Sequence, residues 1–317
     1  AGLMPDDFAL IGTSPIPMTK AEFLAHAKDV VDQFGSNKAE GPEWDAFAAR
    51  LDYIISSDKE MDDLSDAVQK ADAALGSSAR SLLYLSIPPF AMAEMVKAIG
   101  ESGLNSARTR VIMEKPFGTN LKTAKALNAL LHSVFKESQI YRIDHFLGKE
   151  DVQDILAVRF ANRLFEPMWN TSNVERIEID VPETLGVEDR AKFYESTGAY
   201  RDMVVTHLFQ ALGFVAMEPP AGFNAKDLHE GRYAVFAALR PLDPARVVRG
   251  QYVGYRDLPD VADDSDVETM VAVEAFIDND RWRGVPIYLR TGKRMAEGRR
   301  VITLTLREPA HAIFQTD

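Results

Sequence analysis

The sequence predicts an α/β protein with two domains, the first built around a parallel sheet and the second an α+β domain with a large, mainly antiparallel sheet. Three observations support this prediction. Short apolar runs alternate with amphipathic helical stretches up to about residue 150, and after it strands of period two follow one another without intervening helices. A length of 317 residues is also about what two domains require. We therefore expect domains at residues 1–150 and 151–317.

Four strands are predicted in the first domain, each ending at a turn or near the start of a helix. They are Phe8–Gly12, Ser81–Ile87, Arg110–Met113 and Ile140–Ile143. Thr19 followed by Glu22 has the pattern of a capping box, which predicts a helix running to about Phe34. Another helix is expected to begin at Thr119 or Asn120. Strands that alternate with helices in this way usually pair in parallel.

The second domain is predicted to form its sheet from strands in which apolar and polar residues alternate. They include Arg176–Asp180, Thr269–Ile277 and Arg300–Leu306. The acidic stretch Asp257–Glu268 lies among these strands, but it lacks the ligand spacing of a calcium loop. We interpret it as a solvated turn and expect no metal site.

The composition limits the classes of function. The 36 basic and 48 acidic residues give a formal charge of -12, which argues against a surface for nucleic acid or an anionic membrane. An anionic ligand therefore needs a local basic pocket. The absence of cysteine excludes disulfides, thiolate metal ligands and a cysteine nucleophile, and it fits a cytoplasmic location. The most apolar stretch, Leu208–Met217, is far shorter than the roughly 20 residues of a membrane span.

The segment Asp144–Lys149 is a candidate anion site because it follows a predicted strand, where α/β proteins place ligand groups. If the chain turns into a helix here, His145 and Lys149 are four residues apart and share one face. That face could present two cations to a phosphate at the positive end of the helix dipole. The alternative, which the spacing alone favours, is a helix start with Asp144 as its cap and both bases in solvent.

His207 is a candidate base because a helix would place it among apolar residues. It is four residues from Met203 and Ala211 and three from Val204. Burial lowers the pKa of an imidazole and a carboxylate partner raises it, so the two effects together could keep it basic near neutral pH. The alternative, which the segment alone favours, is a core histidine bonded to a backbone carbonyl.

Further candidate residues follow other predicted strands. Lys115 lies at a predicted sheet edge, and its bond to Pro116 is a candidate cis peptide; a surface lysine before a turn fits equally well. Lys293 ends a strand-to-turn segment, for which a charged hairpin end is the alternative. Glu183 and Asp202 are carboxylates among turn-like residues and on their own would be expected at the surface.

In this order and at these separations, the segments resemble glucose-6-phosphate dehydrogenase over nearly the whole chain. The string Asp-His-aromatic-Leu-Gly-Lys-Glu at residues 144–150 is the most specific of them. The other matching segments are Met4–Phe8, Tyr84–Pro89, Glu114–Gly118, Arg142–Ile143, Arg159–Arg163, Phe165–Pro167, Trp169–Asn170, the His207 segment, Arg249–Tyr252 and Tyr288–Lys293. The resemblance implies a Rossmann-like NAD(P)-binding domain without its first unit, followed by a substrate-binding and oligomerisation domain.

The resemblance also implies a reaction and a role for each candidate residue. A hydride would pass from C1 of β-D-glucose 6-phosphate to the nicotinamide of NADP, or of NAD, giving 6-phosphogluconolactone in the first step of the oxidative pentose phosphate pathway. His207 would take the C1 hydroxyl proton, with Asp144 orienting its imidazole. The remaining roles are phosphate binding by His145 and Lys149, sugar binding by Glu183, Asp202 and Lys293, and contact with both sugar and nicotinamide by Lys115.

Four departures from the family pattern qualify these roles. The glycine-rich cofactor fingerprint should precede Met4 and is absent from this sequence. Thr13–Ile16 stands where the family usually has an arginine for the 2′-phosphate of NADP, so the preference for NADP over NAD is open. Phe146 replaces the usual tyrosine, and Gly298 occupies the place of a second sugar-site lysine. Arg299 or Arg300 is a possible substitute for that lysine.

We interpret the sequence as a fragment missing both ends of the family's chain, with the substrate site largely present. The resemblance suggests a homodimer or homotetramer. One alternative is a non-catalytic sugar-phosphate binding protein derived from this family. Another is an active dehydrogenase of the same fold that prefers NAD or a different hexose phosphate.

Overall fold

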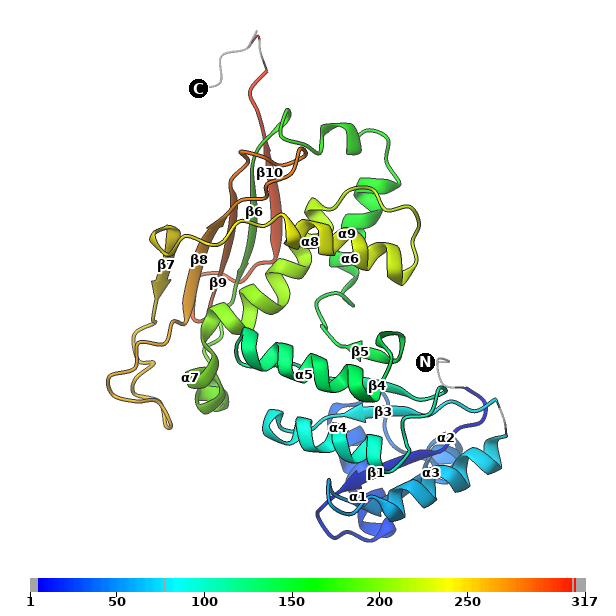
Figure 1. Cartoon of the computed structure of the whole chain (residues 1–317). Helices are drawn as coiled ribbons and strands as arrows, with labels where there is room; N and C mark the ends of the chain where they lie inside the picture. The colour runs from blue at the N-terminus through cyan, green and yellow to red at the C-terminus, as the bar shows by residue number, and fades with distance from the viewer. Residues whose placement is uncertain (1–4, 77, 310, 312–317) are drawn as a thin grey trace. The chain divides into compact units, whose positions relative to one another are not determined.

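The computed structural model describes residues 5–76, 78–309 and 311, and the chain forms two compact units, Ala1–Ile143 and Asp144–Asp317 (Figure 1). Each unit has its own hydrophobic core. The division of domains at residue 150 stays a prediction. Within the described residues, no helix combines the length and the apolar composition needed to cross a bilayer.

In the first unit, every strand pair among the described residues is parallel, as predicted. The strands are β1 (Leu10–Ser14), β2 (Leu51–Ile55), β3 (Leu82–Leu85), β4 (Arg110–Met113) and β5 (Ile140–Arg142). β1 pairs with β2, and β3, β4 and β5 form a second sheet in that order. Val111 and Met113 of β4 are fully buried, so the central strand of the second sheet carries the core of this unit.

Helices and short 3-10 turns connect the strands of the first unit. They are α1 (Lys20–Phe34), α2 (Gly41–Ala48), α3 (Asp62–Leu75), α4 (Met92–Glu101), α5 (Leu121–Val134) and the 3-10 turns Pro89–Ala91 and Glu137–Gln139. The predicted capping box begins α1: the backbone N–H of Thr19 donates to Glu22 at 2.7 Å, and the N–H of Glu22 donates to Thr19 Oγ1 at 3.3 Å. Asn120 caps α5. Both helix starts follow from side chains that accept from otherwise unpaired amides.

The second unit is organised around one five-stranded sheet. Its strands are β6 (Val174–Pro182), β7 (Val247–Gly250), β8 (Met270–Ala275), β9 (Ile287–Gly292) and β10 (Val301–Leu306). They lie in the order β10-β6-β9-β8-β7, and only the β6–β9 pair is parallel. The prediction of a mainly antiparallel sheet is therefore confirmed.

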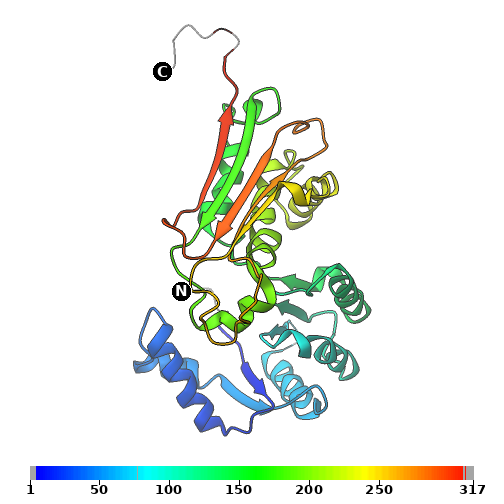
Figure 2. The same cartoon turned by 90° about the vertical axis from the view of Figure 1, so that its left-hand side faces the viewer.

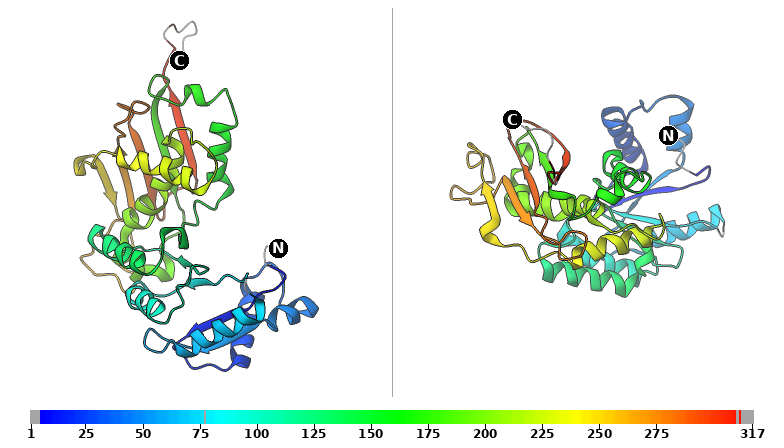
Figure 3. Two further views of the ribbon diagram at one scale, coloured as in Figure 1. Left: turned by 45° about the vertical axis from the view of Figure 1, so that its right-hand side comes forward. Right: turned by 90° about the horizontal axis from the view of Figure 1, so that it is seen from above.

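Helices pack on one face of this sheet (Figure 2). They are α6 (Glu150–Phe160), α7 (Ala191–Ala199), a π-helical segment (Tyr200–Leu208), α8 (Phe209–Ala216) and α9 (Ala225–Ala237), with 3-10 turns at Glu166–Met168, Glu188–Arg190 and Pro244–Arg246. α8 packs between α6 and α9, and Figure 3 shows α9 in yellow running across the sheet. The sheet face under the helices is called the core face below.

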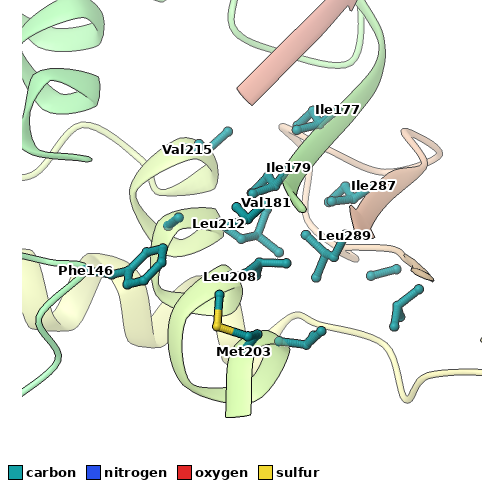
Figure 4. Close-up of a cluster of buried hydrophobic side chains, with 14 of the residues drawn as sticks. Phe146, Ile177, Ile179, Val181, Met203, Leu208, Leu212, Val215, Ile287 and Leu289 are labelled. Carbon is teal, nitrogen blue, oxygen red and sulfur yellow. The ribbon is translucent and has the colours of Figure 1, made fainter. Parts of the chain in front are cut away.

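The core face positions the helical segment that carries the candidate base. Val181 and Ile179 of β6 and Leu289 of β9 point toward Leu208 and Leu212 (Figure 4). All five side chains are at most 5% exposed. Burying such a side chain contributes about 1.5–3 kcal/mol. Apolar packing therefore fixes the π-helical segment against the end of β6.

Candidate active site

The centre of the site is a hydrogen bond between His207 and Asp144. His207 lies on the π-helical segment and is 1% exposed, and its Nδ1 is 2.6 Å from Oδ1 of Asp144. The backbone N–H of Phe146 donates to the same Oδ1 at 3.0 Å. Because a carboxylate only accepts, Nδ1 carries the proton and Nε2 is the basic nitrogen of the ring. The expected partner of a core histidine, a backbone carbonyl, is thus replaced by a carboxylate.

Gly198 produces a kink in the chain just before the π-helical segment. Gly198, at the end of α7, has a φ of 72°, and a Cβ at this position would lie 2.6 Å from Oε1 of Glu268. Glycine therefore lets Glu268 approach the chain, where the carboxylate accepts from the N–H of Tyr200 at 3.0 Å. The prediction of a helix with His207 on its apolar side is confirmed, with the difference that the helix is π. Such segments often occur at functional sites.

Two aromatic rings contact the imidazole of His207. The ring of Phe146 stacks on the imidazole with a centroid distance of 4.2 Å and an interplanar angle of 14°. The ring of His145 meets it edge to face at 4.8 Å. Lys149 Nζ lies 3.8 Å from the centroid of Phe146. The candidate base and the two candidate phosphate ligands are therefore neighbours, and Phe146 contacts all three.

His145 and Lys149 do not share a helix face, because the chain does not turn into a helix at this segment. Residues 144–149 form consecutive turns, in which the N–H of Leu147 donates to the carbonyl of Asp144 and that of Lys149 to the carbonyl of Phe146. α6 begins only at Glu150, with Lys149 as its N-cap. The bonds of Asp144 to His207 and Phe146 hold the chain in turns before it can enter the helix. Lys149 still lies at the positive end of the helix dipole.

Glu183 and Lys293 form an ion pair at the end of β6 and β9. Lys149 belongs to the same electrostatic cluster. Burial and the positive charge of Arg300 lower the pKa of its ammonium, while Glu183 and Asp144 oppose this effect. The expected surface position of Glu183 is only partly correct, because its side chain is 34% exposed. The charge of Glu183, a candidate sugar residue, thus acts on the candidate phosphate residue Lys149.

Asp202 is buried rather than exposed, at 6%. Its charge acts on Tyr194, which is not among the candidate residues from the sequence. Burial and the charges of Asp202, Glu268 and Glu183 raise the pKa of the Tyr194 hydroxyl. That hydroxyl is buried without a hydrogen-bond partner in the described part of the chain. No short motif surrounds Tyr194, so the sequence offered no signal for it.

Lys115 belongs to the first unit and follows β4. Lys115 is half-buried, and its bond to Pro116 is cis, as predicted. β1 ends at Ser14, whose Oγ accepts from the N–H of Ile16 at 3.1 Å. The turn after β1 therefore offers hydroxyl and backbone groups, and residues 13–16 contain no cation.

Three side chains of the site could also ligate a metal ion, because each offers one ligand atom and these atoms lie within 4.8 Å of one another. They are those of Asp144, His145 and His207. Two of these atoms are already joined by the hydrogen bond between His207 and Asp144. The positive charge of Lys149 acts on the same carboxylate. The arrangement suits proton transfer and an anion better than a metal cation.

The fold and the site together define a class of protein. Its members have a parallel-stranded α/β unit followed by a sheet domain, and the sheet domain carries a buried histidine–carboxylate pair beside lysine side chains.

Two family descriptions match the sequence. "Glucose-6-phosphate dehydrogenase, NAD binding domain" matches residues 1–154, and "Glucose-6-phosphate dehydrogenase, C-terminal domain" matches residues 156–317. The chain belongs to the glucose-6-phosphate dehydrogenase family.

Individual relatives agree with this assignment. Glucose-6-phosphate 1-dehydrogenase 1 of Mycobacterium tuberculosis is 40% identical over 312 residues, which cover 97% of this chain and 65% of that protein. The crystal structure of glucose-6-phosphate 1-dehydrogenase from Mycobacterium avium has a TM-score of 0.89 and 38% identity, and the match covers 97% of this chain and 68% of that one. A glucose-6-phosphate dehydrogenase in complex with its substrate glucose-6-phosphate has a TM-score of 0.87 and 30% identity over 96% and 66% of the two chains. The chain spans about 65% of the length of the curated relatives it matches.

Proposed function

We propose that this chain provides the substrate site of a glucose-6-phosphate 1-dehydrogenase, which oxidises β-D-glucose 6-phosphate at C1 to 6-phosphogluconolactone. The observation that carries this proposal is the buried bond between His207 and Asp144 next to His145 and Lys149. A base beside an anion site is what the oxidation of a phosphorylated sugar requires. The resemblance over the whole chain supports the same substrate.

In the proposed reaction, Nε2 of His207 accepts the proton of the C1 hydroxyl. Nδ1 keeps its bond to Asp144, and the carboxylate stabilises the imidazolium as it forms. When bound, a nicotinamide dinucleotide supplies the acceptor for the hydride that leaves C1. The C1–O bond then becomes the carbonyl of the lactone, so one proton and one hydride leave the sugar.

The other residues bind and orient the sugar phosphate. His145 and Lys149 contact the phosphate, and the turns that separate them from α6 place both side chains beside the base. Glu183, Asp202 and Lys293 are assigned to the sugar hydroxyls. Carboxylates accept hydrogen bonds from such hydroxyls, and a lysine donates to them.

NADP is proposed as the cofactor, with NAD as the alternative. The parallel-stranded first unit fits a nicotinamide dinucleotide, and Lys115 is assigned to its contact with the nicotinamide and the sugar. The turn at Thr13 and Ser14 supplies hydroxyls and no guanidinium for a 2′-phosphate. Discrimination against NAD is therefore expected to be weak.

The remaining parts of the proposal concern the cell. We assign the protein to the cytoplasm and to the first step of the oxidative pentose phosphate pathway, as a homodimer or homotetramer. The negative net charge of -12 supports a function without nucleic acid or membrane.

A pair of substitutions tests the proposed function. His207→Asn should abolish turnover and largely spare the binding of glucose 6-phosphate, because the base acts on C1 and not on the phosphate. Lys149→Ala should instead weaken that binding. Turnover is followed by the absorbance of reduced nicotinamide and binding by titration calorimetry. Turnover by His207→Asn at the parent rate would show that another group is the base.

A further inference from the structure

The strand register fixes the direction of two neighbouring arginines, Arg299 and Arg300. β10 runs antiparallel to β6, with Val301 opposite Asp180. The N–H of Arg299 donates to the carbonyl of Pro182 at 3.2 Å, so the same register continues beyond the start of β10. Arg300 is therefore opposite Val181. Opposite residues of an antiparallel pair project from the same face of the sheet.

The two arginines consequently belong to different faces. Val181 is 5% exposed and packs on the core face, which places Arg300 there as well. Asp180 projects from the other face, where it accepts from Arg290 at 2.7 Å and from Arg299 at 2.6 Å. The bond of Arg299 to Asp180 is an independent check on the register. Arg299 is therefore directed away from the candidate site.

The cluster around Glu183 lies on the side of Arg300. Glu183 follows Val181 by two residues, and it pairs with Lys293. The N–H of Met295 donates to the carbonyl of Glu183 at 2.9 Å, and that of Arg294 to the carbonyl of Leu185 at 2.8 Å. The loop between β9 and β10 is thus fastened to the end of β6, with Lys293 at its start and Arg300 at its end.

We propose that Arg300 contributes a guanidinium to the phosphate of the substrate, beside Lys149, and that Arg299 does not. This inference rests on the proposed function for the identity of the sugar phosphate. A guanidinium can donate two parallel hydrogen bonds to a phosphate, which a lysine cannot. The charge of Arg300 reaches Lys149 and, after burial, is the next largest cause of its lowered pKa. Two like charges that act on each other repel, and an anion bound between them would relieve this repulsion.

The sequence supplies a matched control for the test. Arg300→Ala and Arg299→Ala remove the same charge from adjacent positions on opposite faces, and Asp180 keeps Arg290 in the second variant. Affinity for glucose 6-phosphate and for inorganic phosphate is measured by titration calorimetry at low and high salt. Because a charge-assisted bond is lost, Arg300→Ala should weaken both affinities about tenfold and reduce their salt dependence, whereas Arg299→Ala should change them less than about twofold.

The outcomes separate this inference from the proposed function. If Arg300→Ala binds both ligands as the parent does, Arg300 is not a phosphate ligand, and the His207 and Lys149 variants still decide the function. A second outcome is that Arg300→Ala weakens the binding of inorganic phosphate, but the parent binds glucose 6-phosphate no more tightly than inorganic phosphate. Arg300 would then be supported as a phosphate ligand, and the assignment of a sugar phosphate as substrate would fail. If the parent binds neither ligand, both are overturned. Arg300→Lys should recover part of the lost affinity.

Discussion

Replacing Asp144 by Asn tests how the carboxylate acts on the base. Oδ1 of Asp144 accepts from both His207 Nδ1 and the N–H of Phe146. If the NH₂ group of the asparagine took the place of Oδ1, it would face the N–H of Phe146, which is also a donor. The amide oxygen should therefore occupy the place of Oδ1, and the NH₂ group that of Oδ2. His207 then keeps the same tautomer and loses only the charge of its partner. A charge-assisted bond is worth about 1.5–3 kcal/mol, which corresponds to about a 10- to 150-fold loss of kcat.

Stability gives a second readout of the Asp144→Asn substitution. The NH₂ group would take the place of Oδ2, which is buried without a partner among the described residues. An unsatisfied buried donor costs about 1–3 kcal/mol, so the free energy of unfolding should fall by about that amount. The assay is kcat and KM from reduced-nicotinamide absorbance, with unfolding followed in urea. A kcat within threefold of the parent would refute a role for the charge. A loss near the roughly 10⁴-fold seen when a triad histidine changes tautomer would refute the argument from Phe146.

Three further predictions concern charge and backbone. Burial and the charge of Arg300 lower the pKa of Lys149 below its ordinary value of 10.5. Affinity for glucose 6-phosphate, measured by calorimetry, should therefore decline as pH rises through this lowered pKa. A decline that starts only above pH 10.5 would contradict this prediction. Burial raises the pKa of Asp180, but its bonds to Arg290 and Arg299 outweigh burial and hold it below 3.8, so its stabilisation is present above that pH and lost as pH falls through the lower value. Asp180→Asn should therefore lower the free energy of unfolding by about 1–2 kcal/mol at pH 7. This is less than for a fully buried pair, because both arginines are partly exposed. An unchanged urea midpoint at pH 7 would contradict a stabilising role for Asp180. Gly198→Ala should cost about 1–3 kcal/mol and lower kcat, since a Cβ at φ 72° displaces Glu268 from Tyr200; unchanged unfolding and turnover would contradict the proposed role of this glycine.

Periodicity and capping predicted much of the fold. The capping box at Thr19, the strand Arg110–Met113 and the mainly antiparallel second sheet were all expected from local sequence. Strand ends were less accurate, because the apolar run Phe8–Gly12 does not reveal that pairing with β2 extends the strand to Ser14. Hydrogen bonding across the sheet, rather than hydrophobicity, fixes such ends.

Less of the candidate site than of the fold could be predicted from the sequence. The condition for a shared helix face of His145 and Lys149 was not met, and Asp144 bonds instead to His207, which lies 63 residues away along the chain. The burial of Asp202 and of the Tyr194 hydroxyl depends on tertiary packing that no local pattern reports. Arg299 and Arg300 could not be told apart until the register of β10 on β6 was known.

The role of His207 in sugar oxidation is tested most directly by the absorbance of reduced nicotinamide after glucose 6-phosphate is mixed with NADP, and separately with NAD, for the parent and for His207→Asn. If His207 is the base, the parent should reduce the nucleotide and the variant should not, while calorimetry shows that both bind the sugar phosphate. Equal rates for the two proteins would contradict the assignment of His207. A parent that binds glucose 6-phosphate and either nucleotide without reducing it would favour a non-catalytic binding protein over a dehydrogenase.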